Sequence, residues 1–339
     1  MKSLIINRHA IKNNLQELRK KVDGSVCADL SGDAFGMGLV ETARLLREDG
    51  VRTFAVSEAK EAAKLRANGF TEERIIMLNS FIDKTELETL MDLNVVFCIS
   101  TSEAGVVLNG LADARSTVVE VQIRLDTGVG RGFQAADLDK VFSIYRYMSN
   151  LAVVGISMDF GEEAKSARSI QEKYGVFEQI IESISAAGFE TGETMLIDSF
   201  GWAAGKFETP DTFVFGAAIA GCGELAKVAE ITASIEEISW MPKGSRIGGK
   251  LLSKPKKVAV IAVGTQNGLD VESGRGLLGK LLPKAAATVK IGGAKAKIIG
   301  KPSLFTAAVD VTKLSCGVSD SAQIEVDTLA AKGLDRSYR

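Results

Sequence analysis

The sequence is poor in histidine and cysteine and contains no long apolar run. Its one histidine, His9, falls in an expected helix near the start of the chain, so a serine–histidine nucleophile around Ser31 is not expected. The four cysteines are scattered and form no Cys-x-x-Cys pair. This spacing argues against a disulfide framework and against a zinc site.

Positively and negatively charged residues are also nearly equal in number. The 339 residues carry a net charge of −2 at pH 7, which gives no long-range attraction to nucleic acid or to anionic lipid. No stretch of about 18 uncharged apolar residues is present, as a membrane-spanning helix requires. The opening residues lack the apolar core of a signal peptide. We therefore expect a cytoplasmic protein that binds neither nucleic acid nor membrane.

Apolar strand-like runs alternate with amphipathic helical segments up to about residue 222. Near-continuous apolar strands separated by helices are typical of parallel strands that are covered by helices. The expected strands comprise residues 3–7, the first part of the stretch 26–38, and residues 53–56, 75–78, 95–99, 118–125, 153–157, 195–197 and 213–219. The clearest helices comprise residues 8–22, 39–48 and 59–67. The strand count is close to eight, which predicts a (β/α)8 barrel, with a doubly wound open sheet as the alternative.

The pattern changes beyond Leu225, where β-rich runs are joined by Gly, Pro and Asn turns. These runs comprise residues 231–238, 258–263, 286–291, 296–299 and 307–311. We expect residues 1–225 to form the barrel, with residues 1–8 pairing with the C-terminal domain, and residues 226–339 to form a mostly β domain. The loop 265–280 holds four glycines and is expected to be mobile.

The most informative stretch is residues 26–38, VCADLSGDAFGMG, which reads as a buried strand running into a glycine-punctuated turn. It is followed in order by LDTGVGRGF at 125–133, GISMDF at 155–160, IDS at 197–199 and GAAIAG at 216–221. In this order, the motifs resemble those of the alanine racemase family, and the resemblance covers nearly the whole chain. The Asp-Thr-Gly-x-Gly-Arg run within residues 125–133 is the strongest match.

The resemblance implies a pyridoxal phosphate barrel whose active site is completed by the β domain of a second subunit in a head-to-tail homodimer. In that family, a lysine forms the Schiff base with the cofactor, and Ser31 stands at its position. Thr265 stands at the position of the tyrosine that acts as acid and base. A serine hydroxyl forms no aldimine, and a neutral hydroxyl supplies no proton acceptor without an adjacent base.

Other family positions are changed as well. Phe35 replaces a tyrosine that reaches the phosphate, and Asp159 replaces a histidine that packs near the ring. Val214 occupies the place of the arginine that faces the pyridine nitrogen. Leu304 and Phe305 replace the methionine and aspartate of the substrate-entrance segment.

Part of the family's pocket is retained. Arg131 belongs to the matching Asp-Thr-Gly-x-Gly-Arg turn, and Ser199, Gly216 and Ala217 correspond to part of the phosphate cup. Arg124 stands where the family often has a modified lysine, and Asp198 stands at the asparagine of an Asn-Ser pair. An arginine donates a bidentate pair to an anion, and backbone N–H groups at a barrel rim cradle one. A small anionic ligand is therefore expected at the barrel mouth.

Several alternatives stay open. The glycines of the turn 126–132 hold a loop conformation without any ligand, and Ser199 also suits a helix N-cap. Asp33 and Asp159, both expected near the pocket, form either an acidic pair for acid/base chemistry or ligands of a metal ion, although we expect no metal. Lys206 lies in a loop near the rim and is a candidate substitute for the Schiff-base lysine.

The sequence thus predicts a catalytically degenerate alanine-racemase-like protein, a binding or regulatory homodimer without covalent pyridoxal phosphate. The alternative is an active amino-acid racemase or related isomerase that uses a relocated lysine or an acid/base pair. A partner protein for an active paralogue is a third possibility. Pyridoxal phosphate enters either scheme only non-covalently or through another lysine.

Overall fold

In the computed structural model, the described residues are 2–161, 166–207, 210–269, 288–326 and 328–339. The chain divides into two compact units. One comprises Lys12–Leu225 and is called the barrel unit below. The other, called the β unit, combines Met1–Ile11 with Ala226–Arg339.

The barrel unit is built on an eight-stranded parallel sheet with the strand order β4-β3-β2-β9-β8-β7-β6-β5. The strands are β2 (Ser25–Asp29), β3 (Thr53–Val56), β4 (Arg74–Met77), β5 (Phe97–Ile99), β6 (Val119–Leu125), β7 (Leu151–Asp159), β8 (Glu193–Ile197) and β9 (Thr212–Phe215). The first and last strands of this order meet through Val96, whose N–H donates to the carbonyl of Ile75 at 2.8 Å. The sheet therefore closes on itself, which confirms the predicted barrel and excludes an open doubly wound sheet.

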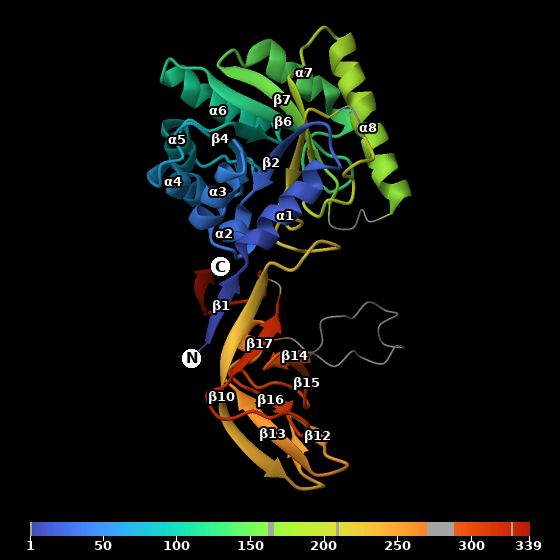
Figure 1. The fold of residues 1–339 in the computed structure, drawn as a ribbon. Coiled ribbons are helices and arrows are strands. Elements are labelled where there is room, and N and C mark those ends of the chain that lie inside the picture. Colours follow the sequence, from blue (N-terminus) through green and yellow to red (C-terminus); the bar gives the residue numbers. More distant parts are fainter. Residues whose placement is uncertain (1, 162–165, 208–209, 270–287, 327) are drawn as a thin grey trace. The chain divides into compact units, whose positions relative to one another are not determined.

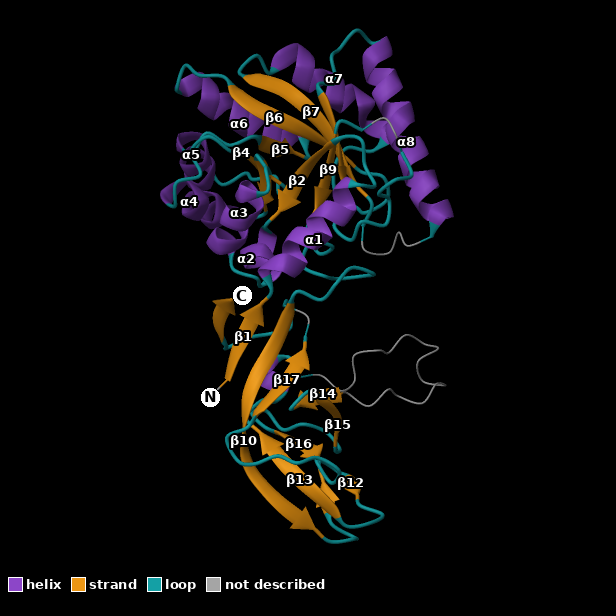
Figure 2. Cartoon of the chain, viewed as in Figure 1, coloured by secondary structure: helices purple, strands orange, loops and turns teal. Residues whose placement is uncertain are grey.

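Amphipathic helices surround the barrel strands (Figures 1 and 2). They are α1 (Arg8–Arg19), which begins in the β unit, α3 (Leu39–Glu48), α4 (Ala59–Ala67), α5 (Lys84–Asp92), α6 (Ser102–Ala114), α7 (Leu138–Tyr147) and α8 (Ala167–Ala186). Each buries one stripe of apolar side chains, as Leu39, Ala43 and Leu46 do in α3. The spacing of three or four residues keeps the buried positions on one side of the helix.

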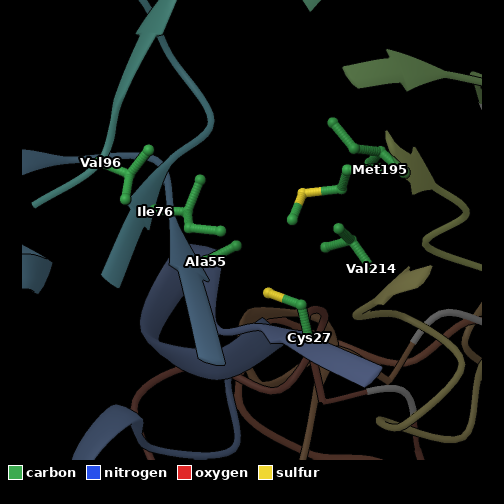
Figure 3. Close-up of a cluster of buried hydrophobic side chains, with 7 residues drawn as sticks. Cys27, Ala55, Ile76, Val96, Met195 and Val214 are labelled. Atoms are coloured by element: carbon green, nitrogen blue, oxygen red, sulfur yellow. The ribbon is translucent and has the colours of Figure 1, made fainter. Parts of the chain in front are cut away.

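The interior of the barrel is closed by apolar side chains. Cys27, Ala55, Ile76, Val96, Met195, Ile197 and Val214 form one buried cluster contributed by strands around the sheet. Figure 3 shows the side chains of Cys27, Met195 and Val214 directed into the same space as those of Ala55 and Ile76. This packing fills the interior of the barrel with side chains. A ligand-binding site is therefore expected at the carboxyl ends of the strands.

The β unit holds a second eight-stranded sheet, with the strand order β13-β16-β15-β14-β17-β10-β1-β18 and an additional β13–β10 pairing. Its strands are β1 (Lys2–Ile6), β10 (Ala229–Met241), β13 (Lys256–Ile261), β14 (Thr288–Ile291), β15 (Ala294–Ile298), β16 (Ala307–Asp310), β17 (Ser321–Glu325) and β18 (Asp335–Tyr338). Strand β1 pairs antiparallel with β10 and parallel with β18. The short strands β11 (Arg246–Ile247) and β12 (Lys250–Leu251) form a separate hairpin.

Some expected element boundaries differ from the structure. The strand expected at 213–219 ends at Phe215, because the N–H groups of Gly216 and Ala218 turn back to the carbonyl of Ser199. The helix expected at 8–22 ends at Arg19. Most of the glycine-containing loop 265–280, and the first residues of the strand expected at 286–291, lie outside the described residues.

Candidate functional site

A cavity of about 230 Å³ opens at the carboxyl ends of the barrel strands. Its walls come from residues at or just after the ends of β2, β3, β4, β6, β7 and β8. Most of the lining side chains are polar, and two arginines and three aspartates are among them. Barrel enzymes carry their active sites at this end of the strands.

The wall that follows β2 is a left-handed turn, the short element α2 (Ser31–Phe35). Gly32, Asp33 and Ala34 have φ between 55° and 64°, and Phe35 has φ 53°. Left-handed geometry is unfavourable for residues with a side chain, so it persists only where the surroundings hold it. Glu61 supplies part of that hold, because its carboxylate accepts the N–H groups of Asp33 at 3.1 Å and of Ser57 at 3.2 Å.

Three side chains at this wall form a hydrogen-bonded group. The N–H of Ser31 donates to Asp29 Oδ1 at 2.9 Å, and the hydroxyls of Ser31 and Ser57 lie 2.6 Å apart. Asp29 is only 8% exposed. Burial raises its pKa to about 6, against the opposing effect of the hydrogen bonds from Ser31. The cavity therefore contains a carboxyl group that titrates near neutral pH.

The opposite wall carries an ion pair in which Arg124 is buried and Asp159 is partly exposed. Arg124 Nη2 donates to Asp159 Oδ2 at 2.5 Å, and Nη1 donates to the carbonyl of Leu78 at 3.0 Å. The second oxygen of Asp159 accepts the N–H of Gly161 at 2.9 Å. The Nε of Arg124 is buried and has no hydrogen-bond acceptor among the residues that the structure describes.

Arg131 belongs to the turn at 126–132. The carboxylate of Asp126 organises this turn by accepting the N–H groups of Gly128, Val129 and Gly130 at 2.8–2.9 Å. Burial raises the pKa of Asp126, but these bonds outweigh it and the pKa lies below its usual value. The turn thus has a structural reason to persist without a ligand.

The guanidinium of Arg131 reaches across to another part of the rim. Its Nη2 donates to Asn79 Oδ1 at 2.5 Å, and Asn79 Nδ2 donates to the carbonyl of Ser57 at 2.9 Å. Gly132 permits this arrangement, because it has φ +114° and a Cβ there would lie 2.5 Å from the carbonyl oxygen of Arg124. Arg131, Asn79 and Ser57 therefore form one connected edge of the cavity.

The positions expected to cradle an anion are occupied by internal contacts. Ser199 Oγ accepts the N–H of Ala217 at 3.1 Å, and the Ser199 carbonyl accepts that of Ala218 at 2.7 Å. A Cβ at Gly216 would lie 2.4 Å from Cε2 of Phe35, so the phenyl ring packs directly on this glycine. The backbone donors are engaged, and the ring of Phe35 covers the glycine beside them.

Asp198 shapes the loop that follows β8. Its carboxylate accepts the N–H groups of Trp202, Ala203 and Ala204 at 2.7–3.1 Å. Burial raises the pKa of Asp198, against the opposing effect of these backbone hydrogen bonds. The carboxylate is satisfied by the protein itself and has a structural role.

The structure brings half of the sequence-predicted site residues into one cavity. These are Ser31, Phe35, Arg124, Arg131, Asp159, Asp198 and Ser199. Gly216 and Ala217 lie next to the lining, whereas Val214 belongs to the buried cluster inside the barrel. Asp33 lies outside the lining, because its carboxylate accepts the N–H of Leu39 and pairs with Lys64. Asp33 and Asp159 therefore do not face each other across the cavity.

The remaining predicted residues lie elsewhere. Thr265, Leu304 and Phe305 belong to the β unit. Leu304 and Phe305 are 63% and 56% exposed at the tip of a turn. Lys206 is exposed on the barrel unit and does not line the cavity. Within the described residues, no group of three or more His, Cys, Asp or Glu side chains is arranged to hold a metal, and no helix is long and apolar enough to cross a membrane.

Sequence reasoning missed Asp29, Ser57 and Asn79 as cavity residues. Each carries the same signal, a polar residue at or just beyond the end of an apolar barrel strand. Carboxyl ends of barrel strands converge on one mouth, so this signal was available from the expected strands alone.

Comparisons with known proteins agree with this fold. Residues 6–210 match the family described as "Alanine racemase, N-terminal domain". An alanine racemase of Haemophilus influenzae is 27% identical over 296 residues, covering 82% of this chain and 80% of that protein. A lysine racemase of Proteus mirabilis is 24% identical over 333 residues, covering 91% of this chain and 77% of that protein.

Solved structures show the same fold over the whole length. Alanine racemase from Streptomyces coelicolor A3(2) has a TM-score of 0.86 at 17% identity, covering 99% of this chain and 97% of its own. The enzyme from Bartonella henselae, solved with covalently bound pyridoxal phosphate, has a TM-score of 0.83 at 20% identity, covering 100% and 99%. Since the family match spans more than half of the sequence, this chain belongs to the alanine racemase N-terminal domain family.

Proposed function

We propose that this chain has lost Schiff-base catalysis with pyridoxal phosphate and acts as a binding or regulatory protein with a small-ligand site at the barrel mouth. The main observation behind the proposal is that residue 31 is a serine. Ser31 lines the cavity, and no lysine is among the described lining residues. The family resemblance aligns Ser31 with the lysine that forms the Schiff base. An aldimine requires a primary amine, which a serine does not supply.

The surroundings of the expected phosphate seat also support this proposal. In a pyridoxal phosphate protein, such a seat offers free backbone N–H groups to the phosphate oxygens. Here the Ala217 N–H donates to Ser199 Oγ, and the Phe35 ring packs on Gly216. The residues present do not fit a covalently bound cofactor of this kind, so no catalytic step through it is derived.

We further propose that the chain forms a head-to-tail homodimer. The family resemblance places the segments around Thr265 and around Leu304–Phe305 at the barrel mouth of a second subunit. In the β unit, Leu304 and Phe305 are large exposed apolar side chains on a turn held by the Ser303 hydroxyl. A partner surface would remove these two side chains from water.

An active racemase is the second candidate, favoured by the relatives, which are named alanine, lysine and amino-acid racemases. A racemase that uses pyridoxal phosphate needs an amine that is not among the described lining residues. Lys206 is the candidate for this amine from the sequence analysis. An active racemase can instead use a cofactor-free acid/base pair, for which Asp29 and Asp159 are candidates among the three carboxyls that line the cavity, since the third, Asp198, accepts three backbone N–H groups. Both versions predict turnover, which the first proposal does not.

A racemisation assay separates the two candidates. The purified protein is incubated with L-alanine or L-lysine, with and without added pyridoxal phosphate, and the D-isomer is measured by chiral chromatography. We expect the D-isomer to form no faster than in buffer, because the described residues that line the cavity include no lysine, and Asp159 and Asp198 are engaged by Arg124 and by backbone N–H groups. The Haemophilus influenzae enzyme serves as the positive control. Saturable turnover that Lys206→Ala abolishes would establish the relocated-lysine enzyme instead.

A further inference from the structure

One hydroxyl of the cavity has a carboxyl group beside it. The N–H of Ser31 donates to Asp29 Oδ1 at 2.9 Å, and the Ser31 side chain also hydrogen-bonds Asp29, which lowers the pKa of that carboxyl group. The hydroxyl of Ser57 lies 2.6 Å from that of Ser31. A hydroxyl both donates and accepts, so Ser57 donates to Ser31 Oγ while the Ser31 proton is directed to Asp29. The three side chains form one hydrogen-bonded chain that ends on a base.

The backbone around Ser31 is strained. Ser31 is half-buried, lines the cavity and begins the left-handed turn at 31–35. In this turn Asp33, Ala34 and Phe35 have φ between 53° and 58°. Such conformations cost free energy and cluster at functional sites, where they hold a side chain in a defined position. The turn therefore presents the Ser31 hydroxyl to the cavity at a fixed place beside Asp29.

We propose that Ser31 is a nucleophile that takes up the acyl group of small activated esters, with Asp29 as its general base, and that the site hydrolyses them. This inference goes beyond the proposed function, which requires binding alone. A serine becomes nucleophilic when an adjacent base accepts its proton, and here the base is a carboxylate. The cavity volume of about 230 Å³ lies below the range of about 300–1,000 Å³ usual for larger ligands, which favours a small acyl group.

The proposed reaction has two steps. In the first, Asp29 takes the proton of Ser31 while Ser31 Oγ bonds to the carbonyl carbon of the ester. The bond from that carbon to the leaving oxygen then breaks, and Asp29 passes the proton to this oxygen. In the second step, Asp29 takes a proton from water, the water oxygen bonds to the acyl carbon, and the proton returns to Ser31 Oγ as its bond to carbon breaks. The products are a carboxylic acid and an alcohol.

The choice of activated esters follows from the strength of the base. A carboxylate is a weak base, so the tetrahedral intermediate goes forward only when the leaving oxygen is less basic than the serine alkoxide. The negative charge on that intermediate lies beside a cation of the same cavity edge. Arg131 donates to the neutral amide of Asn79, which donates to the Ser57 carbonyl. A fixed positive charge of this kind stabilises a developing oxyanion.

The pH dependence of the reaction is set by the surroundings of Asp29. Burial raises the pKa of Asp29 to about 6, Glu61 on α4 and Asp159 on β7 raise it further, and the hydrogen bonds from Ser31 lower it. Glu61 accepts backbone N–H groups, and Asp159 is paired with Arg124. Asp29 is the carboxyl group next to the nucleophile, and it acts as a base only when it is ionised. The rate should therefore rise with pH up to about 6 and then level off.

Hydrolysis of p-nitrophenyl acetate between pH 4.5 and 8 tests this proposal. We expect the rate above buffer to rise by about tenfold per pH unit below about pH 6 and to be constant above it. After an acid quench, mass spectrometry of the digested wild type should find an acetyl group on Ser31. Asp29→Asn should lower the rate by at least about 100-fold and remove the inflection. Ser31→Ala should lower the rate to that of buffer.

A matched control is Ser143→Ala on α7. The exposed Ser143 hydroxyl donates to the Asp139 carbonyl at 2.8 Å, and its loss should leave the rate unchanged. The proposal is overturned if the wild type carries no acetyl group on Ser31, if Ser31→Ala keeps the wild-type rate, or if the rate has no inflection near pH 6. The acetyl measurement uses the wild type alone and does not depend on the folding of a variant. These results leave the loss of Schiff-base catalysis standing, because the racemisation assay decides that claim.

Discussion

Replacing Asp198 with alanine is expected to lower the free energy of unfolding by about 4 kcal/mol. The buried Asp198 carboxylate accepts three backbone N–H groups of the loop that follows β8, and hydrogen bonds to a charged group contribute roughly 1.5–3 kcal/mol each. The cost of burying this charge, which raises the pKa of Asp198, offsets part of their sum. The substitution leaves the N–H groups of Trp202, Ala203 and Ala204 without this acceptor. Urea unfolding monitored by circular dichroism gives the difference.

A matched control for Asp198→Ala is Asp83→Ala in the same unit. Asp83 is an exposed N-cap that accepts one N–H, from Glu86 at 2.9 Å. Loss of such a cap costs about 1 kcal/mol. If the two variants lose the same stability, Asp198 does not organise the loop.

Replacing Asp29 with asparagine is expected to stabilise the protein at pH 7.5 by up to about 3 kcal/mol. Burial raises the pKa of Asp29 from 3.8 to about 6, so the folded protein at higher pH carries an unfavourable buried charge. That difference in pKa corresponds to about 3 kcal/mol. Asparagine keeps an oxygen that accepts the Ser31 N–H and carries no charge.

The gain from Asp29→Asn depends on pH with a defined sign. A raised pKa means that the folded state binds more protons between pH 3.8 and about 6, so the wild type loses stability as the pH rises through this window. Below pH 3.8, both states of the wild type are protonated, and the gain disappears. Unfolding of both proteins at pH 4.0, 5.0, 6.0 and 7.5 measures it.

Asp159→Asn is the contrasting variant for Asp29→Asn, because it weakens the ion pair of the buried Arg124. Breaking a fully buried pair by removing one partner costs about 3–5 kcal/mol, and the loss here is expected to be smaller because the Asp159 side chain is 27% exposed. The two substitutions should therefore change stability in opposite directions at pH 7.5. A gain from Asp29→Asn that is the same at all four pH values would contradict the assignment of a raised pKa to Asp29.

Regular elements with strong periodicity could be predicted from the sequence. The expected segments 39–48, 53–56 and 59–67 coincide with α3, β3 and α4, because a buried stripe or a short apolar run sets their limits. Strands β17 and β18 were not predicted, since polar runs such as Asp335–Tyr338 become strands through pairing with β1. Non-local hydrogen bonding of this kind leaves little signal in the local sequence.

Site residues could be predicted from the sequence where they belong to a family motif. They could not be predicted where the backbone conformation determines the direction of the side chain. Ser31 and Arg131 were found because their motifs include them. Asp33 was expected beside the ligand, but the left-handed turn at 32–35 directs its carboxylate to the N–H of Leu39. Asp29 was passed over as strand, although its position at the end of β2 places it in the cavity wall.

Reductive trapping tests the loss of the Schiff base most directly. The native protein is incubated with pyridoxal phosphate, reduced with borohydride and digested, and each lysine peptide is searched for the phosphopyridoxyl group by mass spectrometry. We predict no lysine modified in stoichiometric amount, because the proposed function has the hydroxyl of Ser31 in place of the family's amine. Stoichiometric labelling of one lysine, at position 206 or elsewhere, together with its loss when that lysine is replaced, would contradict the proposed function.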